Sequence, residues 1–152
     1  MSLLQNRLVG TLPSGWSVLS GLEILHISEN AINGTLPKSW GNMANLAQLV
    51  LRNNKLSGTL PAEWADLAFL SELQLHANRL SGSLPAEWAG LSALKPLLLS
   101  DNLNINGTLP PQWEKLSMTV TPSRAAAGEL GQHDGAGRAD VTNESAEWHA
   151  AA

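Results

Sequence analysis

The 152-residue chain contains no cysteine, and only 14% of its residues are charged. Without cysteine it cannot form a disulfide framework or a cysteine metal site. No apolar run reaches 18 residues, so the sequence predicts no transmembrane helix. The opening MSLLQNRLVG also lacks the long apolar stretch of a signal peptide. The mild net charge of −4 gives no reason to expect a nucleic acid or an anionic membrane as partner.

The chain does contain an internal repeat. Asparagine occurs at positions 6, 30, 54, 78 and 102, at an unbroken step of 24 residues. Tryptophan occurs at 16, 40, 64 and 88, and then one residue late at 113, because the segment 102–107 is one residue longer than in earlier copies. One copy runs from Leu70 to Ala93, and the unit reads LxxLxLxxNxLSGxLPxxWxxLxx, where x is any residue.

The apolar positions of the unit predict a stack of short strands. Leu73 and Leu75 alternate with polar residues, which is typical of a strand with one buried face. A lone strand cannot bury that face, whereas copies stacked in register share a continuous core. The PAEWAGL stretch is compatible with one helical or 3₁₀ turn on the outer side, with Pro85 at its first position.

Two other residue types recur in every copy of the repeat, asparagine and tryptophan. We predict a structural asparagine ladder, in which each amide bonds backbone groups of its own and the next coil. Its members are Asn30, Asn54, Asn78 and Asn102. The tryptophan column is predicted to fill the core, because its spacing is phased with the other core positions. The alternative is an exposed aromatic ladder that stacks on carbohydrate.

This unit resembles the leucine-rich repeat, and its LSGxLP portion is similar to the plant-specific subclass of receptor ectodomains. The phrase TLPxxW, beginning at Thr11, Thr35, Thr59 and Thr108, resembles more closely the repeats of trypanosomatid surface antigens and proteophosphoglycans. The resemblance covers residues 1–118. It implies an α/β-type solenoid with short parallel strands on the concave face and 3₁₀ or irregular turns on the convex face. It also implies a secreted or membrane-anchored scaffold that binds proteins or glycans through the concave face.

Residues 1–118 are predicted to form the repeat array, a partial first copy followed by four copies of 24–25 residues. The phasing then predicts apolar residues near 119, 122 and 124, but Thr119, Pro122 and Arg124 occupy these positions. Residues 119–152 are therefore predicted to be a low-complexity, disordered tail. The alternative is that Trp148 docks the tail over the open end of the stack. Because the chain opens inside a strand, we expect it to be a fragment of a longer array. The alternative is that its first strand is frayed.

Strand side chains that face away from the core are predicted to form a partner-binding concave face. These candidates are Ile24, His26, Ser28, Gln48, Val50, Arg52, Glu72, Gln74, His76, Leu98 and Ser100. Their mixture of charged, amide and apolar groups suits a protein or peptide better than a small anion. The alternative is a solvated sheet face without a partner. Pro96 lies on the same face and is predicted to weaken the sheet, because it lacks a ladder donor.

The sequence contains few residues that indicate a catalytic, metal-binding or modification site. No motif joins serine, histidine and acidic residues into a nucleophile–base set, so we predict no enzymatic activity and no cofactor. His26 and His76 lie two repeats apart, on the order of 10 Å, which is too far for one metal ion. Sequons beginning at Asn33, Asn106 and Asn143 are candidate glycosylation sites. For Asn33 and Asn106, the alternative is that Asn-Gly simply favours a turn.

The predicted function is a non-enzymatic binding scaffold for a protein, a peptide or a glycan, acting as a monomer outside the cell or at its surface. Arg52 and His76 are the leading binding candidates. Arginine makes several directed hydrogen bonds at interfaces, and histidine changes charge between about pH 5 and 8. The alternatives are a truncated array segment or structural filler without its own ligand, and an intracellular protein-interaction scaffold.

Overall fold

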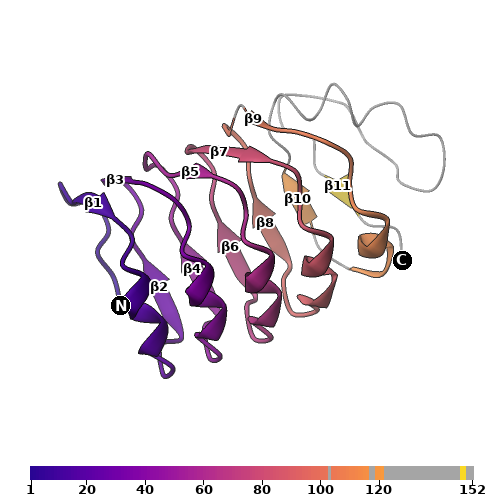
Figure 1. Cartoon of the computed structure of the whole chain (residues 1–152), viewed down its shortest axis with the longest axis horizontal. Helices are drawn as coiled ribbons and strands as arrows, with labels where there is room; N and C mark the ends of the chain where they lie inside the picture. The colour runs from indigo at the N-terminus through magenta and orange to yellow at the C-terminus, as the bar shows by residue number, and fades with distance from the viewer. Residues whose placement is uncertain (103, 117–118, 122–147, 150–152) are drawn as a thin grey trace.

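The computed structural model describes residues 1–102, 104–116, 119–121 and 148–149. Similar coils lie side by side from the N-terminus to the C-terminus (Figure 1). Each complete coil places a short strand on one face and a 3₁₀ turn on the opposite face. The fold is therefore the predicted solenoid, with parallel strands on the concave face and 3₁₀ turns on the convex face.

The concave face is a six-stranded sheet in the order β11-β10-β8-β6-β4-β2. Its strands are β2 (Ile24–His26), β4 (Gln48–Val50), β6 (Glu72–Gln74), β8 (Pro96–Leu98), β10 (Thr119–Thr121) and β11 (Trp148–His149). All neighbouring pairs are parallel except β10 with β11. The register from β2 to β8 advances by one 24-residue repeat per strand, with Leu25, Leu49, Leu73 and Leu97 in line. This register stacks the leucines into one core.

Smaller sheets form the upper edge of the solenoid in Figure 1. Their strands are β1 (Val9–Thr11), β3 (Ala31–Asn33), β5 (Ser57–Gly58), β7 (Arg79–Gly82) and β9 (Asn104–Ile105). The 3₁₀ turns are η1 (Ser14–Val18), η2 (Lys38–Asn42), η3 (Ala62–Asp66), η4 (Ala86–Gly90) and η5 (Pro111–Lys115). Pro85 does not open η4 as predicted, because it is the extended residue just before it, with φ −67° and ψ 126°. In that position its carbonyl accepts the backbone N–H of Trp88.

A column of tryptophans fills the convex side of the core. Trp40, Trp64 and Trp88 are fully buried, which confirms the core interpretation, while Trp16 in the first coil is half-buried. Rings from Trp16 to Trp88 stack nearly parallel, with centroids 6.1–6.4 Å apart. The Trp64 indole N–H donates to the Pro37 carbonyl of the preceding coil at 2.9 Å. The aromatic bulk therefore packs without leaving its polar atom unpaired.

The asparagine column bonds backbone groups inside the stack. The Asn78 amide nitrogen donates to the carbonyls of Leu75 and Leu51 at 2.9 and 3.1 Å, and its oxygen accepts the Leu56 N–H at 3.1 Å. Equivalent bonds surround Asn30, Asn54 and Asn102. These bonds connect each asparagine to the preceding coil, whereas bonds to the next coil were predicted from the sequence. The chain reaches this arrangement through a left-handed residue before each asparagine, such as Ala77 with φ 55°.

The sheet continues beyond the predicted end of the array at residue 118. Val120 pairs with Leu97 and is only 3% exposed, so the boundary and the disordered assignment were wrong for residues 119–121. The reason lies in the backbone after η5: Leu116 is extended with ψ 129°, whereas the equivalent Leu91 has ψ 62°. The chain thus enters the strand three residues after Leu116 (119 − 116), instead of five after Leu91 (96 − 91).

Two further details concern the C-terminal half. Trp148–His149 pairs with β10, so these two tail residues form a strand, and residues 122–147 and 150–152 lie outside the described ranges. Between β6 and β8 the register has two pairs, against three between β4 and β6. The missing pair is the one at Pro96, which has no N–H to donate. In the described part of the chain, no helix is long and apolar enough to cross a bilayer.

Candidate functional site

The register of the concave sheet arranges the candidate residues in three rows. The first row contains Ile24, Gln48 and Glu72, and the second contains His26, Val50, Gln74 and Leu98. The third row contains Ser28, Arg52, His76 and Ser100, two residues beyond each strand. Backbone bonds beyond the strand ends keep this row in line, since the Asn53 N–H donates to His76 and the Ala77 N–H donates to Ser100.

Two of these candidates offer little surface to a partner. Ser28 is 2% exposed and Val50 is 6% exposed, so their assignment to a binding surface was wrong. Val50 lies between His26 and Gln74 in the register, and these longer side chains flank it. Ser28 is a small residue at the position that Arg52 occupies in the next coil. Ile24 is exposed, and the other candidates are half-buried.

Arg52 is held in place by a carboxylate. Its Nη2 lies 2.9 Å from Oε1 of Glu29, and Oε2 of Glu29 accepts a hydrogen bond from Gln5 at 2.7 Å. The Arg52 and Glu29 side chains are 33% and 30% exposed, so solvent weakens this pair and it adds little to stability. The guanidinium carries five N–H groups in a fixed plane, and this contact leaves most of them for a partner. The ion pair therefore positions Arg52 in advance of binding.

His76 stands beside Arg52 in the third row. Burial lowers the pKa of His76 below its ordinary value of about 6.5, the positive charge of Arg52 lowers this pKa further, and Asp101 partly opposes both. Among the described residues, the buried Nδ1 atom of His76 has no hydrogen-bond partner, and neither has Nε2 of His26 in the second row. Buried polar atoms normally have partners, so these two ring nitrogens are exceptions in the described structure.

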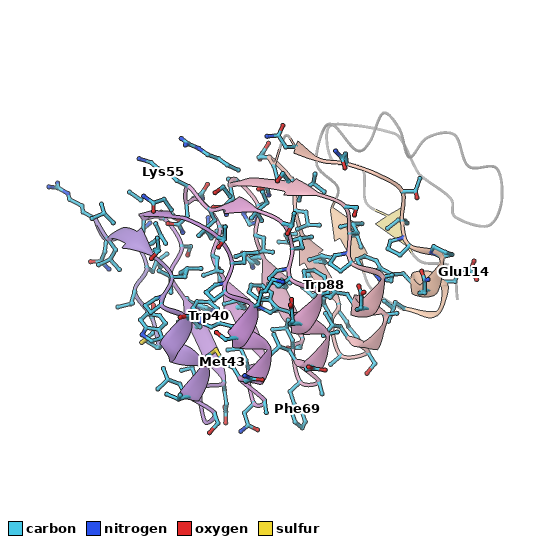
Figure 2. All side chains as sticks on the ribbon, in the orientation of Figure 1. Trp40, Met43, Lys55, Phe69, Trp88 and Glu114 are labelled. Atoms are coloured by element: carbon cyan, nitrogen blue, oxygen red, sulfur yellow. The ribbon has the colours of Figure 1, made fainter. Side chains whose placement is uncertain are left out.

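An exposed aromatic residue at the lower rim was not predicted as a site residue from the sequence. Phe69 is 64% exposed, precedes β6 by three residues, and points away from the solenoid in Figure 2. The signal was available, because the same repeat position holds Gly21, Asn45 and Ala93 and lies outside the apolar template. Large exposed aromatics act as anchors in interfaces. The concave face therefore has an aromatic residue at its lower rim and Arg52 toward its upper edge.

The other candidates lie off the concave face. Asn33 closes β3 and Asn106 follows β9, and both are exposed on the upper edge. Asn143 lies outside the described residues. Within the described ranges, His, Asp and Glu side chains form no group of three or more that could hold a metal ion.

Comparisons with known proteins agree with this geometry. A family model described as "Leucine rich repeat" matches residues 1–56, and no curated protein sequence matches the chain. Among solved structures, the chain is similar to the ectodomain of the Arabidopsis thaliana receptor kinase GASSHO1/SCHENGEN3 in complex with CASPARIAN STRIP INTEGRITY FACTOR 2. The sequence identity is 34% and the TM-score 0.74, over 81% of this chain and 15% of that one.

Two other Arabidopsis structures are similar. One is the receptor kinase HAESA in complex with the peptide hormone IDA and the co-receptor SERK1, at 33% identity and TM-score 0.74, over 82% of this chain and 21% of that one. The other is the BIR3–SERK2 complex, at 27% identity and TM-score 0.70, over 83% of this chain and 71% of that one. The chain spans only 15–21% of several of the receptor chains that it matches. Repeat pattern, backbone and comparisons together identify the fold as a leucine-rich repeat solenoid.

Proposed function

We propose that this chain is a non-enzymatic scaffold that binds a peptide or protein on its concave face, with Arg52 at the centre of the contact. The observation that carries the proposal is the Glu29–Arg52 ion pair, which presents a positioned guanidinium beside His76 on the open side of the sheet. Arginine is enriched among the residues that dominate binding energy, and positioning it beforehand reduces the entropy lost on binding.

The shape of the surface favours an extended peptide. Adjacent rows present the amides of Gln48 and Gln74, which can donate to and accept from a peptide backbone. Phe69 supplies an apolar contact at the lower rim. The structures similar to this chain include a receptor in complex with a peptide hormone, which supports the same class of partner.

The similar structures include plant receptor ectodomains, which supports an extracellular location for this chain. The TLPxxW resemblance to trypanosomatid surface antigens stays a prediction.

A peptide selection tests this proposal. Random dodecamer peptides displayed on phage would be selected against the full chain, and the affinity of the recovered peptides measured by calorimetry. Arg52→Ala should weaken them by tenfold or more, since truncating a dominant interface residue costs about 2 kcal/mol or more. Lys95→Ala, which removes an exposed cation elsewhere, is the matched control. If Arg52→Ala is neutral while Ser57→Arg on the upper edge abolishes binding, the concave site is wrong.

A further inference from the structure

A row of unpaired cations lies on the upper edge of the solenoid, away from the concave rows. It consists of Arg7, Lys55 and Arg79, which we name the edge row. Each directly follows an asparagine of the repeat column, and all three side chains are exposed. Figure 2 shows Lys55 pointing outward from this edge. Ala31 occupies the same position in the second coil. The repeat therefore places three positive charges along one line of the surface.

In the described structure the edge row differs from Lys38 and Arg52 in having no carboxylate partner. Lys38 pairs with Glu63 at 3.0 Å and Arg52 pairs with Glu29 at 2.9 Å. Among the described residues, no carboxylate lies within ion-pair distance of any edge-row side chain. The backbone beneath the row is nevertheless fixed, since the N–H groups of Lys55 and Arg79 donate to the preceding coil at 2.8 and 2.7 Å. The row is thus a set of free charges on a rigid support.

The neighbours of the edge row leave its charge uncompensated. Two positions earlier in the repeat stand Gln5, Glu29, Asn53 and Ala77, and the carboxylate of Glu29 is already bonded to Arg52 and Gln5. Asp101 follows in the fifth coil, so it bounds the row at its C-terminal end. Lys55 and Arg79 stand in adjacent coils, offset by two residues because Arg79 pairs with Ser57, and their like charges repel each other. An anion lying between them would remove this repulsion.

We propose that the edge row binds an acidic segment of an extended peptide. The inference rests on the proposed function, because that segment belongs to the same partner that occupies the concave face. The row spans three coil steps, or about 14 Å, which matches four to five residues of extended chain at about 3.3 Å each. A short segment suits the molecule better than a long polyanion. The net charge of −4 repels a long polyanion where charges come within about 10 Å of each other, since salt screens them at longer distances.

A synthetic peptide containing six consecutive glutamates tests the row directly. Its binding to the full chain would be measured by fluorescence anisotropy at about 20 mM and about 150 mM salt. The double variant Lys55→Gln/Arg79→Gln should weaken binding by about twofold to twenty-five-fold at low salt, since each of the two exposed charge pairs contributes a factor of about 1.4 to 5. Lys95→Gln removes an equally exposed cation outside the row and should change affinity less than twofold.

Several outcomes would overturn the inference. It fails if the glutamate peptide does not bind at low salt, or if Lys95→Gln weakens binding as much as the double variant does. It also fails if a sulfated heparin fragment binds through Lys55 and Arg79 while the glutamate peptide does not, because the partner is then a polysaccharide. The phage-selected peptides separate this inference from the proposed function. Peptides that need Arg52 but not the edge row would leave the concave site standing and remove the acidic contact.

Discussion

Replacing Asn78 by alanine should destabilise the solenoid because one buried backbone N–H group loses its hydrogen-bond acceptor. Asn78 is buried, and its side chain bonds the carbonyls of Leu51 and Leu75 and the N–H of Leu56. The two carbonyls keep other donors, because Asn54 also bonds Leu51 and Asn102 also bonds Leu75. The Leu56 N–H has no other acceptor among the described residues. An unsatisfied buried donor costs about 1–3 kcal/mol, which sets the expected loss in the free energy of unfolding.

Urea denaturation followed by tryptophan fluorescence measures this loss. With a slope of about 1–3 kcal/mol per molar urea, a loss of about 2 kcal/mol lowers the midpoint by about 1 M. Asn6→Ala is the matched control, since Asn6 stands in the same column but is exposed and bonds only local carbonyls in the described structure. It should cost less than about 0.5 kcal/mol. Amide exchange at Leu56 should also accelerate in Asn78→Ala alone. Equal midpoints for Asn78→Ala and the wild type would refute the reasoning.

Three further results are expected. Trp64→Ala should cost about 3–5 kcal/mol, because it leaves a cavity in the aromatic column, and wild-type emission should lie well to the blue of free tryptophan. Truncation after Leu116 should destabilise more than truncation after Thr121, by about 1.5–3 kcal/mol, because only the shorter chain loses buried Val120; equal melting temperatures would contradict this. Because the pKa of His76 is lowered in the folded chain, the unfolded chain binds more protons, and the free energy of unfolding should fall as the pH drops below about 6.5. His76→Gln should flatten this pH dependence in urea titrations at several pH values.

The repeat was enough to predict most of the fold, because period and alternation act on every copy at once. The alternation around Leu73 and Leu75 requires one buried strand face, and the 24-residue step requires the register that places Leu73 beside Leu97. The end of the array was harder to predict. The end of the array coincides with an extended backbone at Leu116, an angle that the apolar composition around it does not reveal.

The candidate site was less predictable than the fold. Alternation predicts which side chains face away from the core, but it carries no information on the burial of Ser28 and Val50. It also missed the partner of Arg52, because Glu29 belongs to the preceding coil and adopts a left-handed conformation with φ 59°. Contacts of this kind depend on the actual path of the backbone between coils, which a pattern of residue types does not contain.

The side-chain N–H groups that bond between coils donate in one direction along the chain, which bears on how the chain is synthesised. Asn54, Asn78 and Asn102 donate to carbonyls of the coil before them, and the indoles of Trp40, Trp64 and Trp88 do the same. A ribosome delivers the N-terminal coils first. Each emerging coil therefore meets its acceptors already in place, and the solenoid can grow by one nearest-neighbour step at a time. A defect in an early coil would accordingly impair every coil made after it.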